Sequence, residues 1–139
     1  MNDDSKPAVT TDVAVVTPAG DGRRVLLIKR ANQPFAGRWA LPGGFLEPRE
    51  LLEHGARREL REETGLEVGA LEQLGAYDTP GRDPRGWIIS VVYIARVGEE
   101  RQVAGADDAA DARWFGLREL PQLAFDHDRV LADVGARLG

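Results

Sequence analysis

Three glutamates at helical spacing, inside a stretch that must also pack against a core, constrain this chain more than any other feature. Residues 50–64 predict one helix, because apolar residues recur every fourth position and Gly65 follows as a C-terminal stop. The recurring apolar residues are Leu52, Ala56 and Leu60. At about 100° per residue, Glu63 lies within this apolar stripe and Glu59 at its border, and with Glu62 the carboxylates span roughly 100° of arc. Such a helix places negative charge beside its own core.

The chemistry of this arrangement points to a divalent cation. Crowded carboxylates repel one another and lose hydration, which is tolerable when a divalent cation lies among them. The alternative, a solvated charged face, would place them opposite Leu52 and Leu60. Mg²⁺ takes oxygen ligands and keeps waters, whereas zinc favours the cysteines and clustered histidines that this chain lacks. We therefore expect Glu59 and Glu63 to be metal ligands, with Glu62 beside them.

The glutamates belong to a longer pattern of fixed spacing. It reads Gly44-x5-Glu50-x7-Arg58-Glu59-Leu60-x-Glu62-Glu63-x-Gly65-Leu66. This pattern resembles the signature of the Nudix hydrolases at every specified position, and residues 39–44, Trp-Ala-Leu-Pro-Gly-Gly, lead into it as in that family. Two positions depart from the family, Arg49 where a glycine is usual and Leu51 where a small polar residue is usual. Both lie where the loop meets the helix and leave the glutamates untouched.

The resemblance implies both a fold and an activity. The fold is α/β, a Nudix-type α/β/α sandwich with a mixed β-sheet. The activity is hydrolysis of a nucleoside diphosphate linked to another group, with Mg²⁺ or Mn²⁺ as the cofactor. The resemblance further implies that Glu59 takes part in catalysis, that the Gly43 carbonyl is a further metal ligand, and that Arg58 orients the glutamates. Arg58 can pair with Glu62, which lies four residues on.

Length and composition favour a single small domain. We expect residues 1–7 to be disordered and residues 8–139 to form one domain, because 139 residues leave no room for a second catalytic domain. There is no cysteine, no apolar run long enough to span a bilayer and no signal-peptide pattern, so we expect a cytoplasmic protein without membrane contact. A net charge of −5 argues against a nucleic-acid partner, since binding to phosphate backbones needs a basic face.

The remaining elements follow from alternation of apolar residues and from turn residues. Strands are predicted at residues 8–16, 25–29, 70–78, 87–97 and 112–115, and a closing amphipathic helix at residues 126–138. Residues 18–22 predict a hairpin turn, and residues 31–38, 79–86 and 98–108 predict loops. The glycine at position 55 is either a neutral substitution or a means of leaving room for metal or substrate.

The general base is the least constrained role. In some Nudix hydrolases it lies within the signature, and in the branch that acts on ADP-ribose it is typically an acidic residue on a loop after the long strand. That loop offers four acids, Glu99, Glu100, Asp107 and Asp108. We favour Asp108 because it comes just before the predicted strand at residues 112–115, as in that branch. The alternative is that these acids are only solvated.

The substrate is suggested by the loop at residues 79–86. Its two arginines, Arg82 and Arg85, are separated by Asp-Pro and can present guanidinium groups to phosphate oxygens. Together with the signature, this loop resembles that of ADP-ribose pyrophosphatases. We expect Phe35 or Trp39 near the adenine, although core packing is the competing role for the three tryptophans. Asp126 is expected to cap the last helix, and His127 could be exposed.

These observations predict a Nudix hydrolase that cleaves ADP-ribose to AMP and ribose 5-phosphate. One alternative is a nucleoside triphosphate pyrophosphohydrolase acting on 8-oxo-dGTP or a similar nucleotide. The other is a non-catalytic sensor that binds ADP-ribose and acts through an attached DNA-binding domain, for which we expect no room because about a dozen residues follow Asp126. A homodimer is expected only from the family resemblance.

Overall fold

The structure is a computed structural model that describes residues 5–20 and 22–139. Its elements are β1 (Ala8–Val16), β2 (Arg24–Arg30), β3 (Trp39–Ala40), β4 (Gly43–Phe45), α1 (Leu52–Thr64), β5 (Glu72–Tyr77), β6 (Ile88–Arg96), β7 (Ala109–Gly116) and α2 (His127–Leu138). Residues 5–7 are exposed and precede β1. The predicted disorder of residues 1–4 and the conformation of residue 21 in the predicted turn lie outside the described residues.

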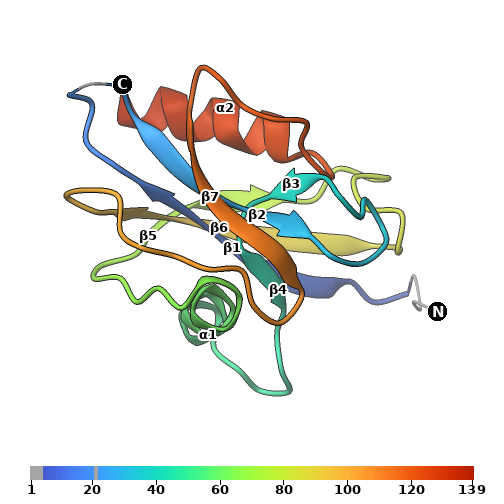
Figure 1. The fold of residues 1–139 in the computed structure, drawn as a ribbon. Helices are drawn as coiled ribbons and strands as arrows, with labels where there is room; N and C mark the ends of the chain where they lie inside the picture. Colours follow the sequence, from blue (N-terminus) through green and yellow to red (C-terminus); the bar gives the residue numbers. More distant parts are fainter. Residues whose placement is uncertain (1–4, 21) are drawn as a thin grey trace.

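A mixed sheet forms the middle layer of the molecule. Its main path runs β3-β2-β1-β6-β5, with β4 paired to β1 and β7 paired to β2. The pair β1 and β6 is parallel along its whole length, from Ala8 opposite Ile88 to Val16 opposite Arg96, and the other pairs are antiparallel. Figure 1 shows α1 on one face of this sheet and α2 on the other. The predicted α/β/α sandwich with a mixed sheet is therefore confirmed.

Alternation along the central strands divides the core between the two helices. Val13 and Val15 of β1 face α1, where they join a cluster with Ala56 and Leu60. The intervening Ala14 and Val16 belong to the cluster on the opposite face, which contains Val130, Leu131 and Val134 of α2. Each fully buried leucine or valine contributes on the order of 1.5 to 3 kcal/mol relative to exposure. Burial on both faces thus fixes β1 in register, and with it the residues that β1 presents at its N-terminal end.

The helix α1 begins and ends for identifiable reasons. It starts at Leu52, later than the predicted residue 50, because Leu51 is extended and Glu50 accepts a hydrogen bond from the Glu47 backbone N–H at 2.9 Å. Gly65 ends the helix as predicted, in a left-handed conformation with φ 76°, and donates its N–H to the Arg61 carbonyl. Among the described residues, no helix is long and apolar enough to cross a membrane.

The short strands β3 and β4 are absent from the sequence-based prediction. Each has three residues or fewer, and β4 contains two glycines, so neither carries a recognisable alternation. The strand β4 pairs with β1, with Asp12 opposite Gly43 and Thr10 opposite Phe45. This pairing brings the loop before α1 onto the N-terminal half of β1 and forms one wall of the site.

Candidate active site

A cavity of about 520 Å³ lies between α1, the loop before it, the N-terminal half of β1 and the loop before β6. This volume is within the range of small-molecule sites. Carboxylates and arginines that come from five different parts of the chain line it together: Asp12, Arg30, Arg58, Glu59, Glu63, Arg82, Asp83, Arg85 and Asp108. The fold therefore collects most of the predicted site residues in one place.

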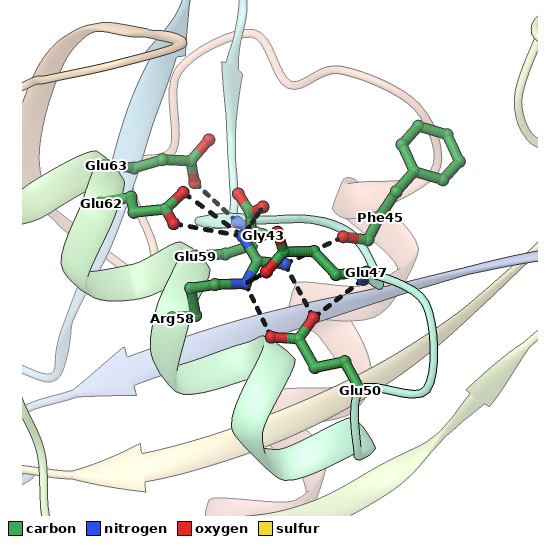
Figure 2. Close-up of polar contacts among 8 residues, drawn as sticks. All are labelled: Gly43, Phe45, Glu47, Glu50, Arg58, Glu59, Glu62 and Glu63. Atoms are coloured by element: carbon green, nitrogen blue, oxygen red, sulfur yellow. Dashed lines mark hydrogen bonds and ion pairs between the residues drawn. The ribbon is translucent and has the colours of Figure 1, made fainter.

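Arg58 is the centre of the acidic network on α1 (Figure 2). Its Nη1 donates to Glu59 Oε1 at 2.8 Å and to both oxygens of Glu62 at 3.3 Å. Its Nε and Nη2 donate to the two oxygens of Glu50 at 2.7 and 2.9 Å. The predicted contact between Arg58 and Glu62 is thus present. The Arg58 guanidinium holds the pKa of Glu50 down at about 2.

Glu63 is the most deeply buried of the three glutamates. Its side chain points from α1 toward β4, where Oε1 accepts a hydrogen bond from the Gly43 N–H at 2.8 Å (Figure 2). The residue is 4% exposed. Burial raises the pKa of Glu63 to about 8, and burial also raises the pKa of Glu59. Keeping both carboxylates ionised in this cavity therefore costs free energy.

The two glycines of β4 permit the close approach of these carboxylates. A Cβ on Gly44 would lie 2.7 Å from the Glu59 carboxyl carbon. A Cβ on Gly43 would lie 2.2 Å from both Asp12 Oδ1 and the Thr11 carbonyl oxygen, which is much closer than van der Waals contact. Any larger residue at either position would displace an acidic side chain. Glycine is needed at both positions because there is no space for a Cβ, and backbone conformation is not the reason, since neither glycine has a positive φ.

Divalent cations are the cofactors that this chemistry suits. Asp12, Glu59, Glu63 and Asp108 line one cavity, and repulsion from neighbouring carboxylates adds to burial in raising the pKa values of Asp12, Glu59 and Glu63. Within residues 5–20 and 22–139, no three carboxylate or imidazole groups form a ready-made metal cage. Mg²⁺ is commonly bound through one or two carboxylates, with waters and substrate phosphates completing its shell. Glu59 and Glu63 supply such a pair and leave room for phosphate.

Asp108, the predicted general base, lies in the wall of the cavity. It comes immediately before β7, lines the cavity, and accepts a hydrogen bond from Asn32 Nδ2 at 3.3 Å. Of the other loop acids, Glu100 forms an ion pair with Arg24 at 3.2 Å, close to the opposite end of β2. The cavity lining includes none of Glu99, Glu100 and Asp107. The structure therefore separates Asp108 from the three acids that sequence reasoning could not distinguish from it.

The two arginines of the loop at residues 79–86 differ in what they can do. The Arg82 side chain is 4% exposed and forms a bidentate ion pair with Asp126, at 2.9 and 2.7 Å. Its remaining Nη1 donates to Ser90 Oγ at 2.8 Å. Arg82 lines the cavity, and these contacts also hold its loop against the N-terminus of α2, so its expected contact with substrate stays a prediction.

Asp126 and His127 also differ from expectation. Asp126 makes no side-chain capping hydrogen bond to α2, because its carboxylate is paired with Arg82. His127 is buried, and its Nδ1 accepts a hydrogen bond from the Leu41 N–H at 3.1 Å. Burial lowers the pKa of His127 to about 4, so the imidazole is neutral at physiological pH. The capping hydrogen bond expected of Asp126 is therefore absent, and the possibility of an exposed His127 does not hold.

Arg85 lies in the cavity wall, held by a buried carboxylate. Its Nε and Nη2 donate to the two oxygens of Asp83 at 3.0 and 2.8 Å. Its guanidinium lies 4.8 Å from the ring centroid of Phe45 and 5.2 Å from that of Phe125. Arg30, at the end of β2, places its own guanidinium 4.9 Å from the Phe125 ring. The two arginines thus form a cationic wall around one aromatic ring.

The aromatic residues expected near adenine do not line the cavity. Trp39 packs edge-on against Phe115, with ring centroids 4.8 Å apart, in the cluster beneath α2. Phe35 packs edge-on against Phe125 at 5.0 Å. Phe45 and Phe125 line the cavity instead. Core packing holds for Trp39 and Trp114, but Trp87 is 43% exposed, so that expectation is wrong for Trp87.

Sequence reasoning missed several residues that line the cavity, among them Asp12, Arg30 and Phe45. Asp12 is buried on β1, and burial raises its pKa to about 7. The signal that could have identified Asp12 is its place in the polar run at residues 10–12 of a strand that is otherwise apolar. Gly55 was given two roles, and the structure supplies a third: a Cβ there would lie 2.5 Å from Leu46 Cδ2, in the loop before α1.

Comparison with known proteins agrees with this geometry. An ADP-ribose pyrophosphatase of Methanocaldococcus jannaschii is 46% identical over 127 residues, which is 91% of this chain and 72% of that protein. The ADPR responsive transcriptional repressor NtrR of Acinetobacter baylyi is 36% identical over 99% of this chain, which spans 56% of the repressor.

Solved structures agree as well. The NUDIX domain of Shewanella oneidensis NrtR, crystallised with ADP ribose, has a TM-score of 0.87 and 32% identity over 96% of this chain and 90% of that one. A MutT/nudix family protein of Enterococcus faecalis has a TM-score of 0.88 and 34% identity, and this chain spans 64% of its length. The NUDIX domain family matches residues 8–134. The chain therefore belongs to the Nudix family.

Proposed function

We propose that this protein is a divalent-metal-dependent hydrolase that cleaves the diphosphate of ADP-ribose to AMP and ribose 5-phosphate. The observation that carries the proposal is that one cavity is lined both by the carboxylates of Glu59 and Glu63 and by the guanidinium groups of Arg30 and Arg85. A diphosphate between two sugars carries negative charge in its centre, so it can meet metal on one side and guanidinium on the other. The 46%-identical pyrophosphatase supports this choice of substrate.

Glu59, Glu62, Glu63 and the Gly43 carbonyl are the proposed ligands of Mg²⁺ or Mn²⁺. When bound, the metal neutralises charge on the diphosphate and helps to orient water. Arg58 keeps the carboxylates of Glu59 and Glu62 in place through the hydrogen bonds of its Nη1. The hydrogen bond from the Gly43 N–H fixes the direction of Glu63. The chain thus holds its acidic groups in place before the substrate binds.

The reaction is the attack of a water oxygen on one phosphorus atom. A bond forms between that oxygen and phosphorus, and the bond from the same phosphorus to the bridging oxygen breaks. Asp108 takes the proton of the water, and Asn32 orients its carboxylate through the 3.3 Å hydrogen bond. The bridging oxygen leaves with the second phosphate. Arg30 and Arg85 face the outer phosphate oxygens, where they stabilise developing charge.

A sensor is the second candidate, because the repressor NtrR is 36% identical over nearly this whole chain. The full set of glutamates on α1 favours hydrolysis over mere binding. The net charge of −5 disfavours direct contact with nucleic acid. The nucleoside triphosphate alternative has weaker support, since the 8-oxo-dGTP diphosphatase relative, a putative assignment in Bacillus subtilis, is 28% identical.

A panel of substrates separates these functions. The protein is incubated with Mg²⁺ and ADP-ribose, dGTP or 8-oxo-dGTP, and the products are separated by chromatography. We expect AMP and ribose 5-phosphate from ADP-ribose, with lower kcat/KM for either triphosphate. Release of pyrophosphate from a preferred triphosphate would overturn the substrate, and tight binding of ADP-ribose without products would favour the sensor.

Three finer properties complete the proposal. We propose Mg²⁺ as the working metal, with Mn²⁺ as a substitute, a homodimer in solution and a cytoplasmic location. Activity in chelator-treated protein resupplied with each metal tests the first property. Light scattering coupled to gel filtration tests the second, since a homodimer doubles the mass of the chain. Microscopy of a tagged chain in its native cell tests the third.

A further inference from the structure

Phe45 combines exposure with a place in the active-site cavity. Among the described residues, the exposed large apolar side chains are Phe45, Leu51 and Trp87, and Phe45 is the one of them that lines the cavity. Its side chain is directed away from the glutamates, while its backbone lies beside them (Figure 2). A partly exposed aromatic ring at a cavity wall offers apolar surface whose burial by a ligand would be favourable.

The backbone of Phe45 is held firmly in relation to the acidic network. The residue pairs with Thr10 of β1, and its carbonyl oxygen accepts a hydrogen bond from Arg58 Nη2 at 3.1 Å. Because Arg58 also binds Glu59 and Glu62, the same guanidinium fixes both the glutamates and the residue that carries the ring. The backbone that carries the ring is thereby held in place relative to the carboxylates.

The ring of Phe45 is also supported from within the cavity. Arg85 lies 4.8 Å from its centroid, in the range of a cation–π contact. The guanidinium cannot turn freely, because two hydrogen bonds tie it to Asp83, whose side chain is 2% exposed. The same guanidinium lies 5.2 Å from Phe125. Phe45 therefore belongs to a fixed stack of rings and cation, with part of one ring exposed to the cavity.

We propose that the Phe45 ring, supported by Arg85, is the surface on which the base of the nucleotide stacks. This inference rests on the proposed function, since it assigns the base of that substrate to a place in the same cavity. A base stacked on Phe45 lies to one side of the glutamates, and the attached ribose and phosphates then reach between the acidic and cationic walls. Trp39 and Phe35, the residues first expected there, pack elsewhere.

A stacking surface at Phe45 favours ligands that carry a base. Stacking on an aromatic ring stabilises every base, because each has a π-face, and it contributes roughly 5- to 150-fold in affinity. The Phe45 surface therefore distinguishes nucleotides from sugar phosphates without a base. It discriminates only weakly between adenine and other bases, so we expect GDP-ribose and ADP-ribose to be bound with similar affinity through this contact.

The test is binding of the two reaction products, which requires no turnover. AMP and ribose 5-phosphate are each titrated by calorimetry, in magnesium chloride, into the wild type and four variants. Phe45→Ala and Phe45→Leu remove the aromatic face, and the leucine variant keeps most of the apolar volume. Phe45→Trp keeps an aromatic face. Trp87→Ala is the matched control, since Trp87 is similarly exposed, at 43%, but lies outside the cavity lining.

We expect both non-aromatic variants to weaken AMP binding about 10-fold or more and to leave ribose 5-phosphate binding unchanged. Phe45→Trp and Trp87→Ala should bind AMP as the wild type does. Equal AMP affinity in the wild type and a folded Phe45→Leu variant would overturn the inference, as would parallel losses for both ligands. Because binding is measured apart from hydrolysis, a failure of the ADP-ribose reaction would be seen separately in the substrate panel.

Discussion

Replacing Asp126 by Asn distinguishes two roles of this residue, a buried ion pair with Arg82 and a cap of α2. Asn is as good a helix N-cap as Asp, so Asp126→Asn would be nearly neutral if Asp126 were a cap. In the structure the carboxylate instead balances a guanidinium whose side chain is 4% exposed. Removing one partner of a buried pair costs about 3 to 5 kcal/mol. Because the Asp126 side chain is itself 19% exposed, we expect the lower part of that range.

Thermal and urea unfolding measure this effect. A loss of about 3 kcal/mol lowers the melting temperature of a chain of this size by roughly 10 °C. The control Asp128→Asn removes an exposed acid from the first turn of α2 and should cost less than about 1 kcal/mol. The double variant Arg82→Met with Asp126→Leu should recover much of the loss, because no buried charge remains unpaired. Asp126→Asn within about 0.5 kcal/mol of the wild type would refute the ion-pair reasoning.

Two further predictions concern the base and the buried histidine. Asp108→Asn should lower kcat on the order of 10² to 10⁴ fold with KM nearly unchanged, and steady-state kinetics with ADP-ribose checks this; a mild effect would move the role to another group. Since the folded pKa of His127 is about 4, below the ordinary value of 6.5, its contribution to stability is complete above pH 6.5 and is lost as pH falls toward 4. His127→Asn should remove roughly 3 kcal/mol of pH-dependent stability in that window, measured by urea unfolding against the wild type; identical pH profiles would contradict the burial of a neutral imidazole.

Regular elements were predictable because their periodicity depends on local sequence. Apolar residues alternate along β1 and recur at every fourth position along α1, because each element buries a defined face. Both elements occur within two residues of the predicted bounds. The strand β7 is longer than expected, Ala109–Gly116 against residues 112–115, because its pairing with β2 extends past Asp111, which breaks the apolar pattern, to Ala109. Pairing across the sheet can therefore override a weak local signal.

The glutamates could be placed from sequence because they lie on one helix, where spacing determines direction. The other wall of the cavity could not, because it depends on contacts between distant segments. Arg82 and Asp126 are 44 residues apart, and nothing in the loop sequence indicates that they form a buried ion pair. Likewise Phe45 lines the cavity only because β4 pairs with β1. Conversely, Trp39 looks like a ligand-stacking residue until its contact with Phe115 is known.

Turnover of ADP-ribose by two glutamate variants of α1 measures whether this cavity is the site of hydrolysis. Glu63→Gln removes a charge that is 4% exposed in the cavity, whereas Glu53→Gln removes an exposed charge from the first turn of α1. With Mg²⁺ present and folding checked by circular dichroism, we predict that Glu63→Gln loses on the order of 10² fold or more in kcat/KM. We predict that Glu53→Gln retains wild-type activity and that AMP and ribose 5-phosphate remain its products. Near-normal turnover by folded Glu63→Gln would contradict the assignment of this cavity as the site of hydrolysis.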